Sequence, residues 1–152
     1  MRKFLLLNSA QRFSDLALLL LRVFVGVFLL WSVWDNVTDG ARMKEFSEFL
    51  AKHDFPAPGI LAPVSAYLQL VIGAGFVLGV FTRWAGILCA FTFAVAIAMV
   101  DRFGGMRGIF PSGCLVVIGL YLASYGAGRF SVDAALGAND LPRSTGGVRF
   151  RN

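Results

Sequence analysis

The stretch "LALLLLRVFVGVFLLW", residues 16–31, decides what class of protein this is. Arg22 is the one side chain in it that is neither apolar nor a glycine. Such a run is typical of a helix that crosses a lipid bilayer, because the hydrocarbon core needs about 20 apolar residues. A charge near the middle of such a helix costs about 2.5–3.5 kcal/mol on insertion scales. The position of Arg22 therefore needs an explanation.

The composition of the whole chain also indicates a membrane protein. Of its 152 residues, 57% are hydrophobic and only 15% are charged, whereas soluble domains carry about 25% charged residues. The net charge is +5, but the basic residues flank the apolar runs instead of gathering on one polar face. This arrangement is typical of membrane topology. We therefore expect the lipid bilayer, and no nucleic acid, as a partner.

Four apolar runs predict an all-α integral membrane four-helix bundle. The expected spans are about 16–34, 61–81, 84–100 and 109–125. Helices are expected because every backbone polar group in hydrocarbon must be bonded within the structure. The predicted organisation is an N-terminal segment over 1–15, a membrane domain over 16–130 and a partly disordered tail over 131–152.

The distribution of basic residues predicts the orientation. An even number of spans places both termini on one side of the membrane. With the termini in the cytoplasm, the inside carries Arg2, Lys3, Arg12, Arg83, Arg129, Arg143, Arg149 and Arg151, and the outside carries Arg42, Lys44, Lys52, Arg102 and Arg107. Cytoplasmic loops of membrane proteins carry an excess of lysine and arginine. We therefore predict a multi-pass protein of the plasma (inner) membrane with both termini cytoplasmic.

A short amphipathic helix is expected on the outer side, between the first two spans. Its apolar residues fall near one helical stripe: Met43, Phe46, Phe49, Leu50 and His53. Phe55-Pro56 should end it. The helix either lies in the plane of the lipid headgroups or folds over the mouth of the bundle as a lid.

Two interpretations of Arg22 are open. Its long side chain could reach the cytoplasmic surface, which removes most of the cost of the charge. Alternatively, it faces the bundle interior and hydrogen-bonds Gln69, the only amide within a span. We favour the second interpretation, because a charge and an amide occur in neighbouring apolar segments. Free guanidinium donors could then also bind a ligand.

Three further residues complete the candidate ligand-binding set. Tyr67 is a polar side chain within the second span, and Trp31 and Asp35 lie at the outer end of the first. Trp31 also suits the aromatic belt at a membrane surface. Asp35 either caps the helix or faces a polar cavity at the mouth of the bundle.

The sequence predicts two free cysteines and no metal centre. Cys89 and Cys114 should differ in height by roughly 15 Å across the membrane, whereas a disulfide needs Cα atoms within about 7 Å. His53 is the only histidine, and the spacing of ligand-type residues fits neither a metal site nor a haem held by this chain alone. Gly75 and Gly79 have the spacing of close helix packing, either within the chain or in a homo-oligomer.

The chain from residue 16 to residue 133 resembles the DoxX family of small four-helix membrane proteins. The resemblance lies in "LLLRVFVG", "FLAKHDFPAPG", "LQLVIGAGFVLGVFTRWAG" and "GAGRFSVD". The positions that match the family pattern are Arg22, Gly26, Phe55, Pro56, Gly73, Gly79, Thr82, Arg83 and Asp133. The sequence departs from the pattern at Gln69, where many members have glutamate, and at "SVWDN", which lacks the lysine that many members have after the first span.

The resemblance implies a function more weakly than it implies a fold. The family takes its name from a subunit of a quinone-linked oxidase. This implies a redox-associated subunit that holds a quinone or lipid in the bundle, with Arg22 and Gln69 as donors and a partner protein supplying electrons. The alternative is a non-enzymatic scaffold or assembly factor. The sequence identifies no catalytic residue and leaves open whether the protein is an enzyme.

Overall fold

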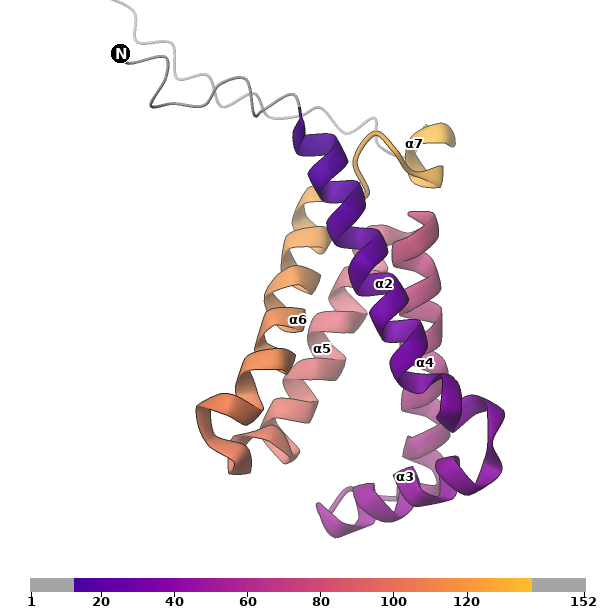
Figure 1. Ribbon diagram of the computed structural model, residues 1–152, viewed down its shortest axis with the longest axis vertical. Coiled ribbons are helices and arrows are strands. Elements are labelled where there is room, and N and C mark those ends of the chain that lie inside the picture. The colour runs from indigo at the N-terminus through magenta and orange to yellow at the C-terminus, as the bar shows by residue number, and fades with distance from the viewer. Residues whose placement is uncertain (1–12, 138–152) are drawn as a thin grey trace, which may run out of the picture.

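The computed structural model describes residues 13–137, and this part of the chain is helical without any strand. The elements are α2 (Ser14–Thr38), α3 (Gly40–Lys52), α4 (Pro58–Leu78), α5 (Thr82–Met99), the 3-10 helix η2 (Asp101–Gly104), α6 (Gly105–Tyr125) and α7 (Val132–Ala135) (Figure 1). The predictions for residues 1–12 and 138–152 lie outside the described residues. Four segments are long and apolar enough to cross a membrane: α2, α4, α5 and the continuous stretch Asp101–Tyr125. The predicted all-α four-helix membrane fold is confirmed.

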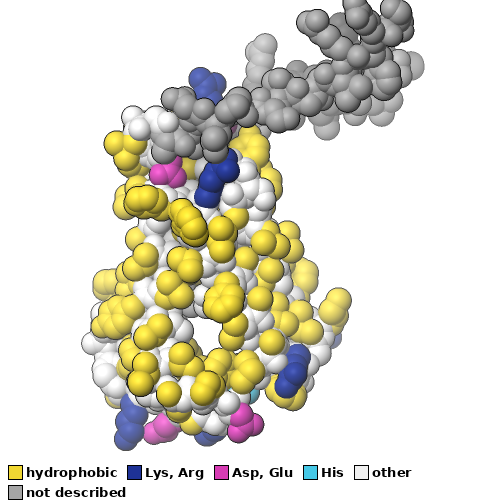
Figure 2. All heavy atoms as spheres, turned by 180° about the vertical axis from the view of Figure 1, so that it is seen from behind, with side chains coloured by type: hydrophobic (Ala, Val, Ile, Leu, Met, Phe, Trp, Pro, Cys, Tyr) yellow, Lys and Arg dark blue, Asp and Glu magenta, His cyan; other side chains and the backbone are white. Residues whose placement is uncertain are grey.

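The surface of the bundle is that of a membrane protein. Hydrophobic side chains cover its flank, and charged side chains gather toward its two ends (Figure 2). Large apolar residues such as Phe24, Val71 and Val117 are mostly exposed. In water such a surface would be unfavourable, whereas a bilayer solvates it.

The helix ends differ from the expected ones by a few residues. The second span ends at Leu78 and not near residue 81, because Gly79 adopts a left-handed conformation with φ 70° and ends α4. The fourth span begins earlier than expected, at Gly105, and Pro111 lies inside α6.

The bundle consists of two closely packed helix pairs, α2 with α4 and α5 with α6. Glycines allow the backbones to touch. A Cβ atom on Gly26 would lie 2.8 Å from the carbonyl oxygen of Gly73, and one on Gly86 would lie 2.5 Å from that of Gly119. In Figure 1 the two pairs converge where α2 begins and α6 ends, which we call the terminal end, and spread apart toward α3.

The helix α3 crosses the open end of the bundle, which we call the α3 end (Figure 1). Asp39 caps α3, because its carboxylate accepts a hydrogen bond of 2.8 Å from the backbone N–H of Ala41. The helix stops at Lys52, shortly before Phe55-Pro56, as the sequence predicts. Its Leu50 is buried against the rest of the protein.

Candidate functional site

Arg22 is buried and points into the bundle, with only 1% of its surface exposed. Its Nη1 donates to the carbonyl oxygen of Ala127, and its Nη2 donates to that of Phe130 at 2.7 Å. Both acceptors belong to the segment that follows α6. The interior interpretation of Arg22 is confirmed, since the guanidinium is enclosed by protein.

The predicted contact between Arg22 and Gln69 is wrong. Gln69 Nε2 instead donates to Ser32 Oγ at 2.7 Å, and Ser32 lies ten residues, about 15 Å, farther along α2 than Arg22. The physical reason is the direction of helical side chains, which lean toward the helix N-terminus. Arg22 therefore reaches the terminal end, whereas Gln69 lies nearer the α3 end.

Close to Arg22, hydrogen bonds of Asp133 connect the segment after α6 to the start of α5. The backbone N–H of Asp133 donates to the carbonyl of Gly79 at 2.9 Å. The Asp133 carboxylate accepts hydrogen bonds from the backbone N–H groups of Phe81 at 2.9 Å and Thr82 at 3.0 Å. These donors at the start of α5 would otherwise lack partners. Residues 131–137, which the sequence assigns to the tail, thus pack onto the bundle.

Gly79 is required at this junction. A Cβ atom there would lie 2.8 Å from Arg22 Cζ and 2.6 Å from the Cβ of Ser131, and the left-handed backbone also favours glycine. Ser131 caps α7, because its hydroxyl accepts a hydrogen bond from the backbone N–H of Ala134 at 3.1 Å. Backbone carbonyl oxygens of the chain itself thus accept hydrogen bonds from both terminal nitrogens of the Arg22 guanidinium. Arg22 therefore has a structural role here.

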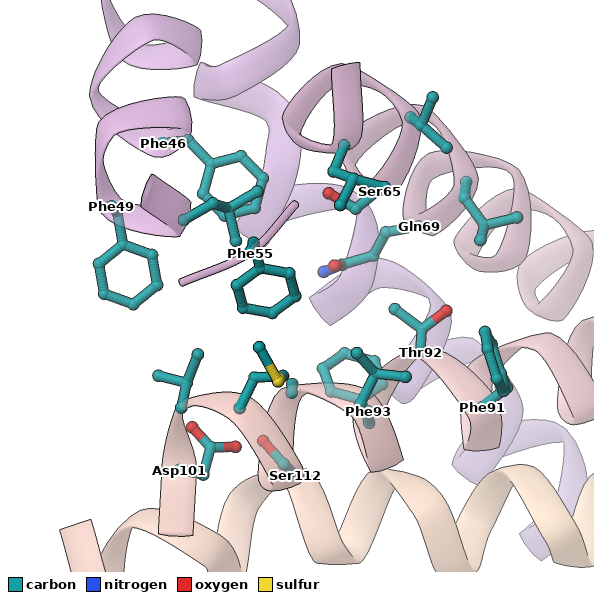
Figure 3. A pocket seen from close by; sticks show the side chains of 18 of the residues that line it. Phe46, Phe49, Phe55, Ser65, Gln69, Phe91, Thr92, Phe93, Asp101 and Ser112 are labelled. Carbon is teal, nitrogen blue, oxygen red and sulfur yellow. The ribbon is translucent and has the colours of Figure 1, made fainter. Parts of the chain in front are cut away.

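A cavity of about 590 Å³ lies at the α3 end, between α3, α4, α5 and the η2–α6 corner. Figure 3 shows this space from close by, and Figure 2 shows the molecule hollowed between hydrophobic side chains in its lower half. Aromatic side chains supply much of the wall: Phe46, Phe49, Phe55, Phe91 and Phe93. The polar lining residues are Ser65, Gln69, Thr92, Asp101 and Ser112.

Helical periodicity explains which residues reach the cavity. From α4, Leu61, Ser65 and Leu68 face it, at spacings of three and four residues. From α5, Thr92 and Ala96, which are four residues apart, both face the cavity. Residues at these spacings lie on one side of a helix, so each helix contributes one face to the wall.

Two polar atoms of the residues that line the cavity lack partners in the described part of the chain. The Gln69 amide is held by Ser32, and the Ser32 hydroxyl donates in turn to the carbonyl of Leu29 at 2.9 Å. Thr92 Oγ1 and Asp101 Oδ2 are both buried, and neither has a hydrogen-bond partner among residues 13–137. Buried polar atoms are nearly always hydrogen-bonded in proteins, so these two oxygens show that the packing around the cavity leaves polar groups unsatisfied.

The family model for DoxX matches residues 17–102, which is more than half of the chain. The chain belongs to the DoxX family. No curated protein and no solved structure matches it. The matched range contains Arg22, Gln69 and Asp101. It ends before α6, so the carbonyl partners of Arg22 lie outside the DoxX match.

The structure brings only one of the predicted ligand-binding residues of this DoxX protein to the cavity. Gln69 lines the cavity, while Arg22 lies at the terminal end. Tyr67 and Trp31 are 54% and 77% exposed, Asp35 is also exposed, and none of the three lines the cavity.

Sequence reasoning missed Thr92, Asp101 and Ser112, which line the cavity from α5, η2 and α6. Asp101 could have been noticed in the sequence, because it is the only carboxylate between the third and fourth apolar runs. Thr92 and Ser112 each looked like an isolated small polar residue in an apolar helix.

The apolar face of α3 belongs to the cavity of this DoxX protein. Phe46, Phe49 and Leu50 all line it, which is what the lid interpretation of this helix predicts. The His53 ring also packs against that of Phe49, with 4.4 Å between the ring centroids. The helix α3 therefore closes one side of the cavity.

Cys89 and Cys114 are free thiols, as predicted from their depths. Cys89 is buried between α5 and α6, where its Sγ lies 3.7 Å from the carbonyl oxygen of Leu115. In the described part of the chain, no three histidine, cysteine, aspartate or glutamate side chains are grouped closely enough to hold a metal ion.

Proposed function

We propose that this DoxX protein is a redox-associated membrane subunit that holds a lipophilic molecule of the quinone class in the cavity at the α3 end. The observation that carries the proposal is an apolar cavity of about 590 Å³ with buried, unpartnered oxygens on Thr92 and Asp101. Small-molecule sites measure about 300–1,000 Å³ and combine apolar walls with a few convergent polar groups.

The residues of the cavity fit a substituted ring with an apolar tail. Phe55, Phe91 and Phe93 offer faces and edges against which a ring can pack. The Gln69 amide and the Thr92 hydroxyl can donate to a carbonyl oxygen. A bound quinone would supply a carrier of two electrons and two protons, and the chain would bind it, orient it and exclude water from it.

A partner protein completes this account. The DoxX family takes its name from a subunit of a quinone-linked oxidase, which supports a role in which the partner exchanges electrons with the bound quinone, while the present chain supplies the membrane site. The competing proposal is a non-enzymatic scaffold or assembly factor. The network around Arg22 suits either role, because it stabilises the bundle whatever the cavity holds.

We further propose that the protein lies in the plasma (inner) membrane with both termini in the cytoplasm. The support is the excess of lysine and arginine on the side of the termini. In this orientation the cavity and α3 lie in the outer half of the membrane.

Binding of a quinone analogue to protein in lipid nanodiscs tests the proposed function. Decyl-1,4-benzoquinone should bind the wild-type protein saturably, beyond its partition into empty nanodiscs. Ala96→Phe should abolish saturable binding, because Ala96 lines the cavity and the larger side chain fills it. Val117→Phe is the matched control, since Val117 is 66% exposed on α6.

The scaffold alternative gives a different result in this experiment. It predicts no saturable binding to the wild-type protein, or equal binding to Ala96→Phe and Val117→Phe. Either result would overturn the quinone proposal.

A further inference from the structure

We infer that Asp101 forms a polar subsite that accepts a hydrogen bond from the ligand, so that the cavity binds the reduced, hydroxyl-bearing form more tightly than the oxidised quinone. This inference rests on the proposed function and specifies which chemical form of the ligand the site prefers.

Close packing fixes the position of Asp101. It is the first residue of η2, at the corner between α5 and α6. A Cβ atom on Gly108 would lie 2.7 Å from the backbone carbonyl oxygen of Asp101, so η2 rests directly on α6. Figure 3 shows the Asp101 carboxylate turned toward the open space that separates α4 from α5.

The Asp101 carboxylate is an acceptor that the described protein leaves unused. Its Oδ2 is buried without a hydrogen-bond partner among residues 13–137. The neighbouring Arg102 places its guanidinium over the Phe103 ring, 4.7 Å from the ring centroid. The two ion pairs within the described residues, Arg42–Glu45 and Arg129–Asp15, do not involve Asp101.

An ionised carboxylate accepts hydrogen bonds and donates none. The carbonyl oxygens of an oxidised quinone also only accept, so a quinone cannot satisfy the Asp101 carboxylate, which lines the cavity. A hydroquinone hydroxyl can donate to it. A buried acceptor without a donor is costly, and hydrogen bonds to charged groups are among the stronger ones in proteins. The reduced ligand is therefore favoured at this position.

The other polar groups of the cavity do not discriminate in this way. The Gln69 amide and the Thr92 hydroxyl both donate and accept, so they suit either form of the ligand. Figure 3 shows the Gln69 amide entering the open space from the α4 side, across from Phe93 and Thr92 on α5, with Asp101 farther along the space. The preference for the reduced form then depends on Asp101.

Three probes test this inference: decyl-1,4-benzoquinone, the corresponding hydroquinone kept under anaerobic conditions, and the dimethyl ether of that hydroquinone. Their affinities are measured by calorimetry in nanodiscs, with empty nanodiscs as the blank. The hydroquinone should bind the wild-type protein at least about tenfold more tightly than the quinone. The dimethyl ether has no donor and should bind no more tightly than the quinone.

Asp101→Asn should remove the preference, because the amide N–H can donate to the quinone carbonyl. Asp54→Asn is the matched control. Asp54 is exposed near the same end of the bundle, its φ of 57° also suits asparagine, and it does not line the cavity. This variant should retain the wild-type preference.

The outcomes separate this inference from the proposed function. Saturable wild-type binding with equal affinities for the quinone and the hydroquinone overturns the inference and leaves the proposed function standing. A preference that survives in Asp101→Asn overturns the assignment to Asp101. Absence of saturable binding by all three probes overturns the proposed function. If Asp101→Asn does not fold, the three wild-type affinities still decide whether the site prefers a donor.

Discussion

At the scale of single residues, Arg22 shows how a charge is accommodated within an apolar helix. Two backbone carbonyls from the segment after α6 accept its hydrogen bonds, and protein encloses its side chain. The carbonyls of such an irregular segment would otherwise be costly to bury in an apolar environment. The arginine and the segment therefore stabilise each other.

Arg22→Leu should destabilise the protein by about 2–3 kcal/mol, because both carbonyls lose a charged donor. Thermal unfolding in detergent measures the effect. Arg42→Leu is the control, since Arg42 makes only an exposed ion pair with Glu45 at 3.1 Å and should change the stability by no more than about 0.5 kcal/mol. Equal loss of stability in the two variants would contradict the structural role of Arg22.

Arg22 and Gln69 should act independently. They share no hydrogen-bond partner, and the partners they have lie at different heights of the bundle. In a double-mutant cycle of Arg22→Leu and Gln69→Leu, the effects on unfolding free energy should add within about 0.5 kcal/mol. A larger coupling energy would place the two side chains in contact.

The sequence allowed part of this residue-level description to be predicted. Burial of Arg22 was predicted because a charge and an amide, Gln69, occur in neighbouring apolar segments, although the two side chains do not contact each other in the structure. Its partners could not be predicted, because a backbone carbonyl has no sequence signature and the one on Ala127 lies 105 residues away. Asp101 was visible as an isolated carboxylate, but its position in a cavity wall depends on how η2 packs against α6.

At the scale of elements, glycine pairs hold the helices of each pair together. Gly86 and Gly119 allow α5 and α6 to approach until a Cβ atom on either would lie within 2.7 Å of the opposite carbonyl oxygen. Apolar runs predicted the helices themselves, since length and hydropathy suffice for that. The pairing of helices and the ends of α4 and α6 depended on backbone contacts that hydropathy does not describe.

Gly86→Ala should destabilise the bundle by about 1–3 kcal/mol, because the added methyl group forces α5 and α6 apart. Gly113→Ala is the matched control on α6. A Cβ atom there would meet only the Cγ2 of Ile109, at 3.9 Å, so this variant should be neutral or slightly stabilising. Unfolding by denaturant in micelles measures both. Similar stability of the two variants would contradict the close approach of α5 and α6.

At the scale of the whole molecule, the two helix pairs meet at the terminal end and separate toward α3, which leaves room for the cavity. The contacts of Arg22, Gly79 and Asp133 lie at the terminal end, and the unpartnered oxygens of Thr92 and Asp101 lie in the cavity wall. Internal contacts thus stabilise the terminal end, where Arg22 Nε and Thr82 Oγ1 are also buried without partners among the described residues, while the cavity lies at the other end of the bundle.

The proposed orientation places α3 outside the cell. In a variant without Cys89 and Cys114, a cysteine introduced at the exposed position Glu48 should react with a membrane-impermeant maleimide on intact spheroplasts. A cysteine at Arg83, in the first turn of α5, should react only after the membrane is disrupted. The reverse pattern would contradict the orientation drawn from the basic residues.

The central claim is that the cavity holds a quinone-class molecule, and the most direct test is to measure what the protein carries when it is isolated. Quinones extracted from purified wild-type protein, quantified by mass spectrometry per mole of chain, should be close to stoichiometric. Val117→Phe should retain this amount, and Ala96→Phe, whose added ring fills the cavity, should lose most of it. No quinone on the wild-type protein, or equal amounts on both variants, would contradict the claim.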